Sequence, residues 1–135
     1  MFYAGIVKIL DPSWTSAGYL KGAKTFSAFY LWLTNPEIIN GVNFLNKWGL
    51  TLLGVSLMIG IFVRLSSVLG AVLMALYYFP VLDFPKAGAY GYIIDEHIIY
   101  ILILVLFAVA GAGRYWGLDE YLVKKTKLKG ITLFS

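Results

Sequence analysis

Ionisable side chains beside long apolar segments are the residues of this chain best suited to chemistry. Glu96 and His97 stand together at the start of a charge-free interval, and Tyr100 follows Glu96 by four residues. Residues four apart share one helix face, so a Glu96–Tyr100 pair can relay protons inside a bundle. Consecutive helix residues point about 100° apart, which predicts that Glu96 and His97 face different ways. Histidine titrates near neutral pH. We therefore predict that Glu96, His97 and Tyr100 are catalytic and transfer protons.

A structural role is the alternative for the same group. An acidic side chain favours the start of a helix because of the helix dipole, whatever its chemistry. A lone histidine at a membrane interface is likewise more often structural than catalytic. The two interpretations differ in where they place these side chains, because only the catalytic one requires them to meet at a common site.

Two arginines and one aspartate form a second group of candidates. Ionisable groups are costly inside a membrane, so each one beside an apolar segment is a functional candidate. Arg64 and Arg114 can bind lipid phosphates or clamp a carboxylate. Asp119 lies five residues after Arg114, and we expect Arg114 and Asp119 to form a structural salt bridge that fixes the tail.

The composition indicates the solvent in which these side chains act. Of the 135 residues, 60% are hydrophobic and 13% are charged, against about 45–50% and about 25% in soluble domains. A single soluble domain this small has too much surface for its volume to hide so much apolar chain, and disorder requires the opposite composition. We therefore predict one integral membrane domain over residues 1–135, surrounded by lipid in the plasma membrane.

The same composition excludes several classes of site and partner. The chain has no cysteine and one histidine, which removes disulfides, thiolate metal sites and iron–sulfur clusters. It shows no nucleotide-binding loop and no Ser-His-Asp set, so we predict no metal, haem, flavin or nucleotide site. The net charge of +4 comes largely from a lysine-rich tail, which is typical of a cytoplasmic membrane flank and not of a nucleic-acid-binding protein.

Charge-free intervals place the helices that must position these residues. They run over 48–63, 65–82 and 97–113. Each approaches the length of about 20 residues that a membrane span needs, because terminal Lys and Arg side chains reach back to the interface. The sequence predicts an all-α, polytopic membrane bundle with spans over 45–63, 65–82 and 94–113, and a partial span over 1–10.

Turn and interface signals refine this prediction. Arg64 is expected at the tip of a tight hairpin between the second and third spans. Pro80 and Pro85 are expected to end the third span. The aromatic run 77–79 marks a membrane interface. The positive-inside preference places the basic tail 114–135, and with it the C-terminus, in the cytoplasm.

The segment between the first and second spans is mixed and rich in aromatic residues. Phe26, Phe29, Tyr30 and Leu33 recur at helical spacing on one face. This pattern predicts an amphipathic helix over about 14–34 that lies in the membrane surface. The dipeptide Asn35-Pro36 is expected to end it.

Three motifs, in order along the chain, support a family resemblance. They are the opening Phe2–Pro12, the run Gly60–Leu65 and the closing segment Gly111–Asp119. Together with Glu96 at the head of the last span, they resemble the DoxX/DoxD-type membrane proteins over nearly the whole chain. The resemblance implies a four-helix bundle, in which the first helix of this chain is expected to be truncated.

The resemblance also implies a function in quinone-linked respiratory or sulfur metabolism. Some members of the family resemble the membrane subunit of thiosulfate:quinone oxidoreductase, and others are associated with an archaeal terminal quinol oxidase. The chain is thus expected to be a subunit of a larger membrane complex. The expected ligands are thiosulfate as a substrate and a quinone as a cofactor. Lys8, at the family's Gly-x-x-Lys position, and Arg64 are the expected binding residues, although Lys8 can equally be an interfacial lysine that reaches towards water.

Two alternatives to a catalytic subunit stay open at this point. The chain can be a non-catalytic structural subunit of a larger complex, or a small lipid-binding bundle. Enzymatic function predicts that Lys8, Glu96, His97 and Tyr100 converge on one cavity. A structural subunit predicts that these four residues are scattered.

Overall fold

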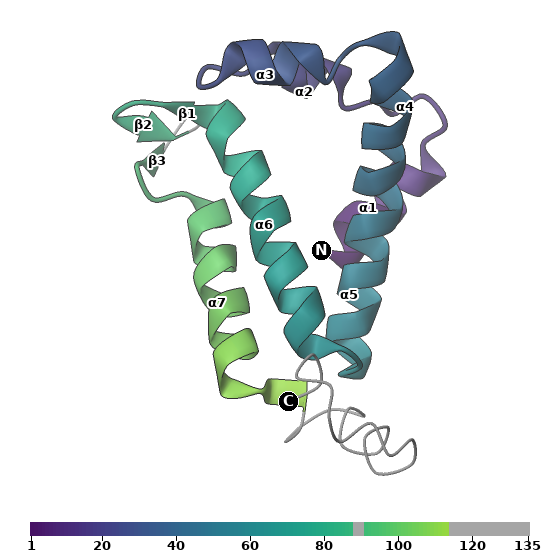
Figure 1. Cartoon of the computed structure of the whole chain (residues 1–135), viewed down its shortest axis with the longest axis vertical. Helices are drawn as coiled ribbons and strands as arrows, with labels where there is room; N and C mark the ends of the chain where they lie inside the picture. Colours follow the sequence, from purple (N-terminus) through teal and green to yellow (C-terminus); the bar gives the residue numbers. More distant parts are fainter. Residues whose placement is uncertain (88–90, 114–135) are drawn as a thin grey trace.

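The computed structural model describes residues 1–87 and 91–113, and its described part is mostly helical. The helices in chain order are α1 (Phe2–Leu10), α2 (Ala17–Lys21), α3 (Ser27–Trp32), α4 (Pro36–Phe44), the π-helix η1 (Leu45–Gly49), α5 (Leu50–Ile59), α6 (Val63–Val81) and α7 (Glu96–Ala110). Figure 1 shows α5, α6 and α7 running lengthwise, with α2 and α3 lying across one end and α1 beside α5. The all-α prediction therefore holds for the main elements.

Helices α4, η1 and α5 form one continuous helix of 24 residues, Pro36–Ile59. The helix therefore begins nine residues before residue 45, the predicted start of the span. Proline fits the first helical turn, where its missing N–H has no partner to lose. Asn35, just before Pro36, has extended backbone angles. The dipeptide Asn35-Pro36 therefore separates the preceding segment from α4 and also begins α4.

The α5–α6 hairpin is as tight as predicted, but Arg64 is not at its tip. The turn consists of Gly60, Ile61 and Phe62, and Gly60 has a φ of 75°, which glycine adopts at no steric cost. Arg64 lies in the first turn of α6. Pro80 does not end α6 either, since the helix continues through it to Val81.

Two helices are long and apolar enough to cross a membrane, Pro36–Ile59 and Val63–Val81. In the most apolar stretch of each, 22% and 39% of the residues are buried. A core helix of a soluble protein would be mostly buried, so the exposed apolar surface favours lipid as the surroundings. Helix α7 has 15 residues, which at 1.5 Å per residue is shorter than the hydrocarbon core of about 30 Å.

Two short helices take the place of the single surface helix predicted over 14–34, and a small sheet follows α6. Helices α2 and α3 are separate, because Phe26 between them has a left-handed φ of 54°. Strands β1 (Leu82–Asp83), β2 (Lys86–Ala87) and β3 (Gly91–Tyr92) form an antiparallel sheet in the order β1-β2-β3, which the sequence did not predict. This sheet connects α6 to α7 beside the α2–α3 end of the molecule (Figure 1).

Hydrogen bonds attach the α2–α3 segment to the end of α6. The Tyr30 hydroxyl donates to the Leu76 carbonyl at 2.9 Å, and the Tyr19 hydroxyl donates to the Tyr77 carbonyl at 2.5 Å. The Leu76 carbonyl is the one that a residue at position 80 would pair with inside an α-helix, and Pro80 has no N–H to offer. Tyr30 therefore supplies the donor that the proline removes.

Helix α1 packs backbone to backbone on α5. A Cβ atom added to Gly5 would lie 2.5 Å from the Thr51 nitrogen, and one added to Gly54 would lie 2.5 Å from the Phe2 Cα. Real Cβ contacts under 3.0 Å essentially never occur. Both glycines are thus required for the close approach, which holds the first half of α1, the turn before Lys8, against α5.

Candidate functional site

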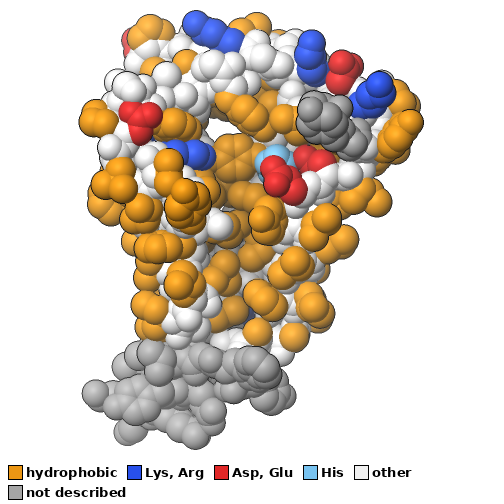
Figure 2. All heavy atoms as spheres, turned by 180° about the vertical axis from the view of Figure 1, so that it is seen from behind, with side chains coloured by type: hydrophobic (Ala, Val, Ile, Leu, Met, Phe, Trp, Pro, Cys, Tyr) orange, Lys and Arg blue, Asp and Glu red, His pale blue; other side chains and the backbone are white. Residues whose placement is uncertain are grey.

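A cavity of about 560 Å³ opens between α1, η1, α6 and α7, beside α2. Its lining combines apolar side chains with polar ones, among them Met1, Ala4, Lys8, Trp14, Tyr19, Asn46, Leu50, Met74, Tyr77, Glu96, His97 and Tyr100. Figure 2 shows this hollow from behind, with a basic side chain at one side and the histidine and acidic side chains at the other. The elements that form it come from both halves of the chain, so it exists only in the folded bundle.

Lys8 occupies one wall of the cavity, within an aromatic setting. Its Nζ donates a hydrogen bond to the Tyr77 hydroxyl at 3.2 Å. The same atom lies 4.7 Å from the ring centroid of Trp14 and 5.1 Å from that of Tyr77. Cation–π attraction and the hydrogen bond both hold the ammonium group at the cavity, so Lys8 is half-buried in protein contacts and is not simply a lysine extended into water.

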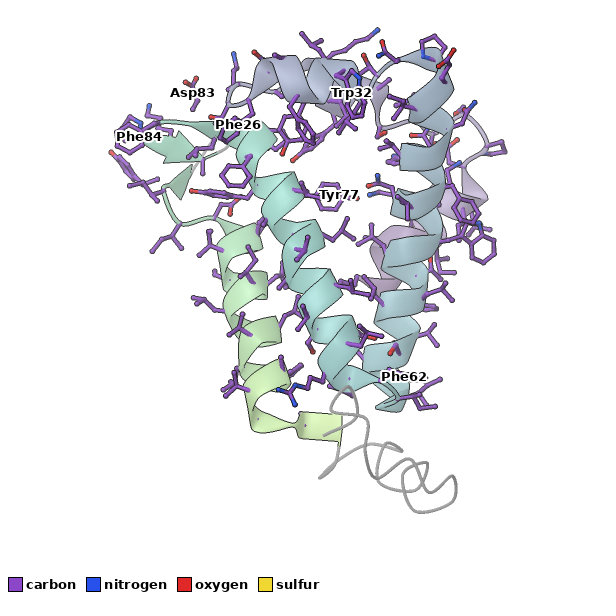
Figure 3. All side chains as sticks on the ribbon, in the orientation of Figure 1. Phe26, Trp32, Phe62, Tyr77, Asp83 and Phe84 are labelled. Atoms are coloured by element: carbon purple, nitrogen blue, oxygen red, sulfur yellow. The ribbon has the colours of Figure 1, made fainter. Side chains whose placement is uncertain are left out.

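Tyr77 and Asn46 join α6 to the π-helix η1. The Tyr77 hydroxyl donates to Asn46 Oδ1, and Asn46 Nδ2 donates to the Val42 carbonyl at 2.8 Å. Figure 3 shows Tyr77 extending from α6 towards the α4–α5 helix. Asn46 is 7% exposed, and a buried amide needs such partners. Single π-turns inside helices occur frequently at functional sites.

His97 lines the opposite wall, and Asp95 supports it from outside the lining. His97 Nδ1 lies 2.7 Å from Asp95 Oδ2. Asp95 is also the N-cap of α7, because its Oδ1 accepts from the backbone N–H of His97 at 3.0 Å and of Ile98 at 3.3 Å. The His97 ring lies 6.1 Å from the Tyr77 ring, between centroids. Tyr77 therefore lies between the Lys8 wall and the His97 wall.

Four of the predicted site residues meet at this cavity: Lys8, Glu96, His97 and Tyr100. The prediction that Glu96 and His97 face different ways is too strict, because the cavity is wide enough for both neighbours to border it. Glu96 and Tyr100 are both exposed, so they stand at its rim and are not enclosed in the bundle.

The structure does not bring Arg64 to this cavity. Arg64 lies 13 residues before Tyr77 on α6, which is about 20 Å along the helix axis. Figure 3 labels Phe62, two residues before Arg64, at the opposite end of α6 from Tyr77. The predicted Arg114–Asp119 salt bridge falls outside the described residues.

Sequence reasoning missed Tyr77, Asn46 and Asp95 as site residues. Tyr77 belongs to the aromatic run assigned to the interface. Asn46 is the second residue of the predicted span 45–63, a position typical of a polar flank. A signal was available for Asp95, since an aspartate two residues before a helical histidine is both a favourable N-cap and within reach of the imidazole.

The charges at the cavity are of both signs. Lys8 stands at one wall, and Glu96 and Asp95 stand at or behind the other. Burial raises the pKa of Tyr19 to about 12, with smaller contributions from Tyr30, Asp95 and Glu96. The Tyr19 hydroxyl therefore remains a neutral donor. Within residues 1–87 and 91–113, no group of three or more His, Asp or Glu side chains is arranged to hold a metal ion.

Comparisons with models of known protein families, with curated proteins and with solved structures found no match. The resemblance to DoxX/DoxD-type proteins therefore stays a prediction. Any functional conclusion depends on the cavity itself.

Proposed function

We propose that this chain is an integral membrane subunit that binds a quinone in the cavity between α1, η1, α6 and α7, within a quinone-linked respiratory or sulfur-oxidising complex. The observation that carries the proposal is the meeting of Lys8, Tyr77 and His97 at one cavity that is otherwise largely apolar. Membrane integration is supported by two helices of sufficient length and hydropathy.

The chemistry of the lining suits a quinone headgroup. Ligand sites are clefts of about 300–1,000 Å³ in which a few polar groups orient a mostly apolar ligand. Met1, Ala4, Leu50 and Met74 supply apolar surface for a ring and the start of its tail. Lys8 supplies N–H donors for a carbonyl oxygen, and an ammonium group carries three of them.

The mixed charge favours a neutral ligand over an anion such as thiosulfate. A doubly charged anion near Lys8 would also lie across the cavity from the Glu96 carboxylate, with the Asp95 carboxylate behind His97. Like charges that are only partly screened repel one another. A quinone carries no net charge and can use the lysine without that penalty.

The residues of this chain would bind, orient and exchange protons. A bound quinone would supply two-electron redox chemistry, with the electrons delivered by other subunits of the complex. Lys8 and the Tyr77–Asn46 pair would fix one side of the ring. His97, supported by Asp95, would stand on the proton-transfer side, and Glu96 at the rim would connect it to water.

Quinone binding by a lysine variant tests the proposal directly. The purified protein in lipid nanodiscs is titrated with a decyl-substituted benzoquinone, and quenching of tryptophan fluorescence reports binding close to Trp14. A hydrogen bond to a charged group contributes about 1.5–3 kcal/mol. Lys8→Met should therefore weaken binding about tenfold or more.

A matched lysine variant supplies the control. Lys21 is exposed on α2 and does not line the cavity, so Lys21→Met should bind the quinone as the unmodified protein does. Equal dissociation constants for the Lys8 and Lys21 variants would refute the proposal. Displacement of the quinone by millimolar thiosulfate would instead favour an anion site at Lys8.

A further inference from the structure

Asp95 uses its two carboxylate oxygens for different partners. Oδ1 accepts from the backbone N–H groups of His97 and Ile98, at 3.0 and 3.3 Å, and so caps α7. Oδ2 lies 2.7 Å from His97 Nδ1. The side chains of His97 and Asp95 are only 19% and 12% exposed. Water therefore competes little for this hydrogen bond, and the helix cap holds the carboxylate in place for it.

This arrangement determines which ring nitrogen carries the proton. A carboxylate only accepts hydrogen bonds, so the partner of Oδ2 must be an N–H group. The neutral His97 ring is then protonated at Nδ1 and carries its lone pair on Nε2. The same support of an imidazole by an aspartate fixes the tautomer in Ser-His-Asp triads. Since Nδ1 faces Asp95, the ring edge left for the cavity carries Nε2.

We propose that Asp95 is a positioning residue that holds His97 in the Nδ1–H tautomer, so that Nε2 of the neutral ring accepts a hydrogen bond from a hydroxyl of the hydroquinone form of the ligand. This inference rests on the proposed quinone site and adds to it a preference for the hydroquinone form of the ligand over the quinone form. A quinone carbonyl has no hydrogen to donate and gains nothing from a neutral Nε2. The hydroquinone hydroxyl gains one hydrogen bond, while Lys8 on the opposite wall donates to the ligand in either form.

Asp95→Asn is the decisive variant because the cap dictates its geometry. Asparagine is as good an N-cap as aspartate, and the cap needs the amide oxygen to face the backbone N–H groups. The amide NH₂ is then turned to His97 Nδ1. An NH₂ group donates, so Nδ1 must accept and the ring proton moves to Nε2. The helix cap is retained while the tautomer reverses.

The tautomer is measured by ¹⁵N NMR of histidine-labelled protein. His97 is the one histidine of the chain, so a protein purified without a histidine tag gives the signals of a single ring. At a pH where the ring is neutral, the unmodified protein should show Nδ1–H, and Asp95→Asn should show Nε2–H. Asp83→Asn, an exposed aspartate in β1, is the matched control and should retain Nδ1–H.

Ligand binding supplies the second readout. The unmodified protein should bind the decyl hydroquinone about three- to tenfold more tightly than the corresponding quinone, the effect of one neutral hydrogen bond. Asp95→Asn should lose or reverse this ratio. Asp95→Ser retains a capping oxygen without reaching His97, and should give a mixture of tautomers and a ratio near one. Helix content by circular dichroism verifies that each variant is folded.

The outcomes separate the two proposals. An Nε2–H tautomer in the unmodified protein, or an unchanged tautomer in Asp95→Asn, would overturn the role of Asp95 even if the quinone binds through Lys8. Absence of binding by either ligand form, with the tautomer as expected, would refute the quinone site and the ligand preference but leave the Asp95–His97 pairing established.

Discussion

The contact between α1 and α5 allows a substitution whose effect can be worked out from the structure. A Cβ atom on Gly5 would lie 2.5 Å from the nitrogen and 2.9 Å from the Cα of Thr51, both of them backbone atoms. Ordinary contact begins at 3.4 Å, so Gly5→Ala must separate the two helices by about 0.9 Å. Backbone atoms cannot rotate away as the end of a side chain can.

The free energy of unfolding should fall by an amount set by two opposing terms. Overpacking against rigid neighbours costs about 1–3 kcal/mol, and the upper part of that range applies to a backbone contact. Alanine is a better helix former than glycine by about 1 kcal/mol. Gly5→Ala should therefore destabilise the protein by about 1–2 kcal/mol. It should also weaken quinone binding, because Lys8 is one turn further along α1 and donates to Tyr77 at 3.2 Å.

Gly41→Ala is the control variant that corrects for the difference in helix propensity between glycine and alanine. Gly41 lies inside α4, and a Cβ atom there meets nothing within 4 Å. The two variants gain the same helix propensity, so the difference between them isolates the overpacking cost, about 2–3 kcal/mol. Unfolding in mixed detergent and dodecyl sulfate, followed by circular dichroism, measures it. Equal stability of the two variants, with an unchanged quinone dissociation constant, would refute the proposed backbone contact.

Two further predictions concern the α2–α3 segment. Tyr30→Phe leaves the Leu76 carbonyl without the Tyr30 donor and should cost about 0.5–1.5 kcal/mol. Adding Pro80→Ala should recover most of the loss, because the alanine N–H can pair with that carbonyl, and a double-mutant cycle of unfolding free energies checks this. Tyr19 has its pKa raised from 10.0 to about 12 by burial, so the stability it contributes is complete below pH 10 and is lost as the pH rises to 12. A pH series of thermal unfolding should show a smaller loss over that window for Tyr19→Phe, and an identical loss would contradict the role of its neutral hydroxyl.

The charged residues and prolines of the sequence predicted some of the helices correctly and others incorrectly. A single helix, α6 at Val63–Val81, is observed where the span 65–82 was predicted. Arg64 in its first turn and Asp83 just after it mark the two ends in the sequence. The helix starting at Pro36 was missed because Glu37 and two asparagines lower the hydropathy of its first turns. The break between α2 and α3 depends on a left-handed Phe26, a conformation that local sequence does not favour for a bulky residue.

Charge predicted much of the site, although Asp95 was missed and Arg64 lies elsewhere, and the parts of the site that depend on geometry were not predicted. Lys8, Glu96 and His97 are conspicuous in sequence because ionisable groups are rare in apolar segments. Tyr77 and Asn46 carry no charge, and each is common at a membrane interface. Their mutual hydrogen bond depends on the π-turn at η1, which no residue pattern in this chain indicated.

The polar wall of the cavity is completed before any ligand arrives. Tyr77 gives its hydroxyl hydrogen to Asn46 and accepts from Lys8, so the cost of placing these groups among apolar helices is met within the protein. An ammonium group has three donors, and the bond to Tyr77 uses one of them. A ligand oxygen can therefore bind Lys8 without breaking that contact. Preorganisation of this kind would reduce the ordering cost of binding the proposed ligand.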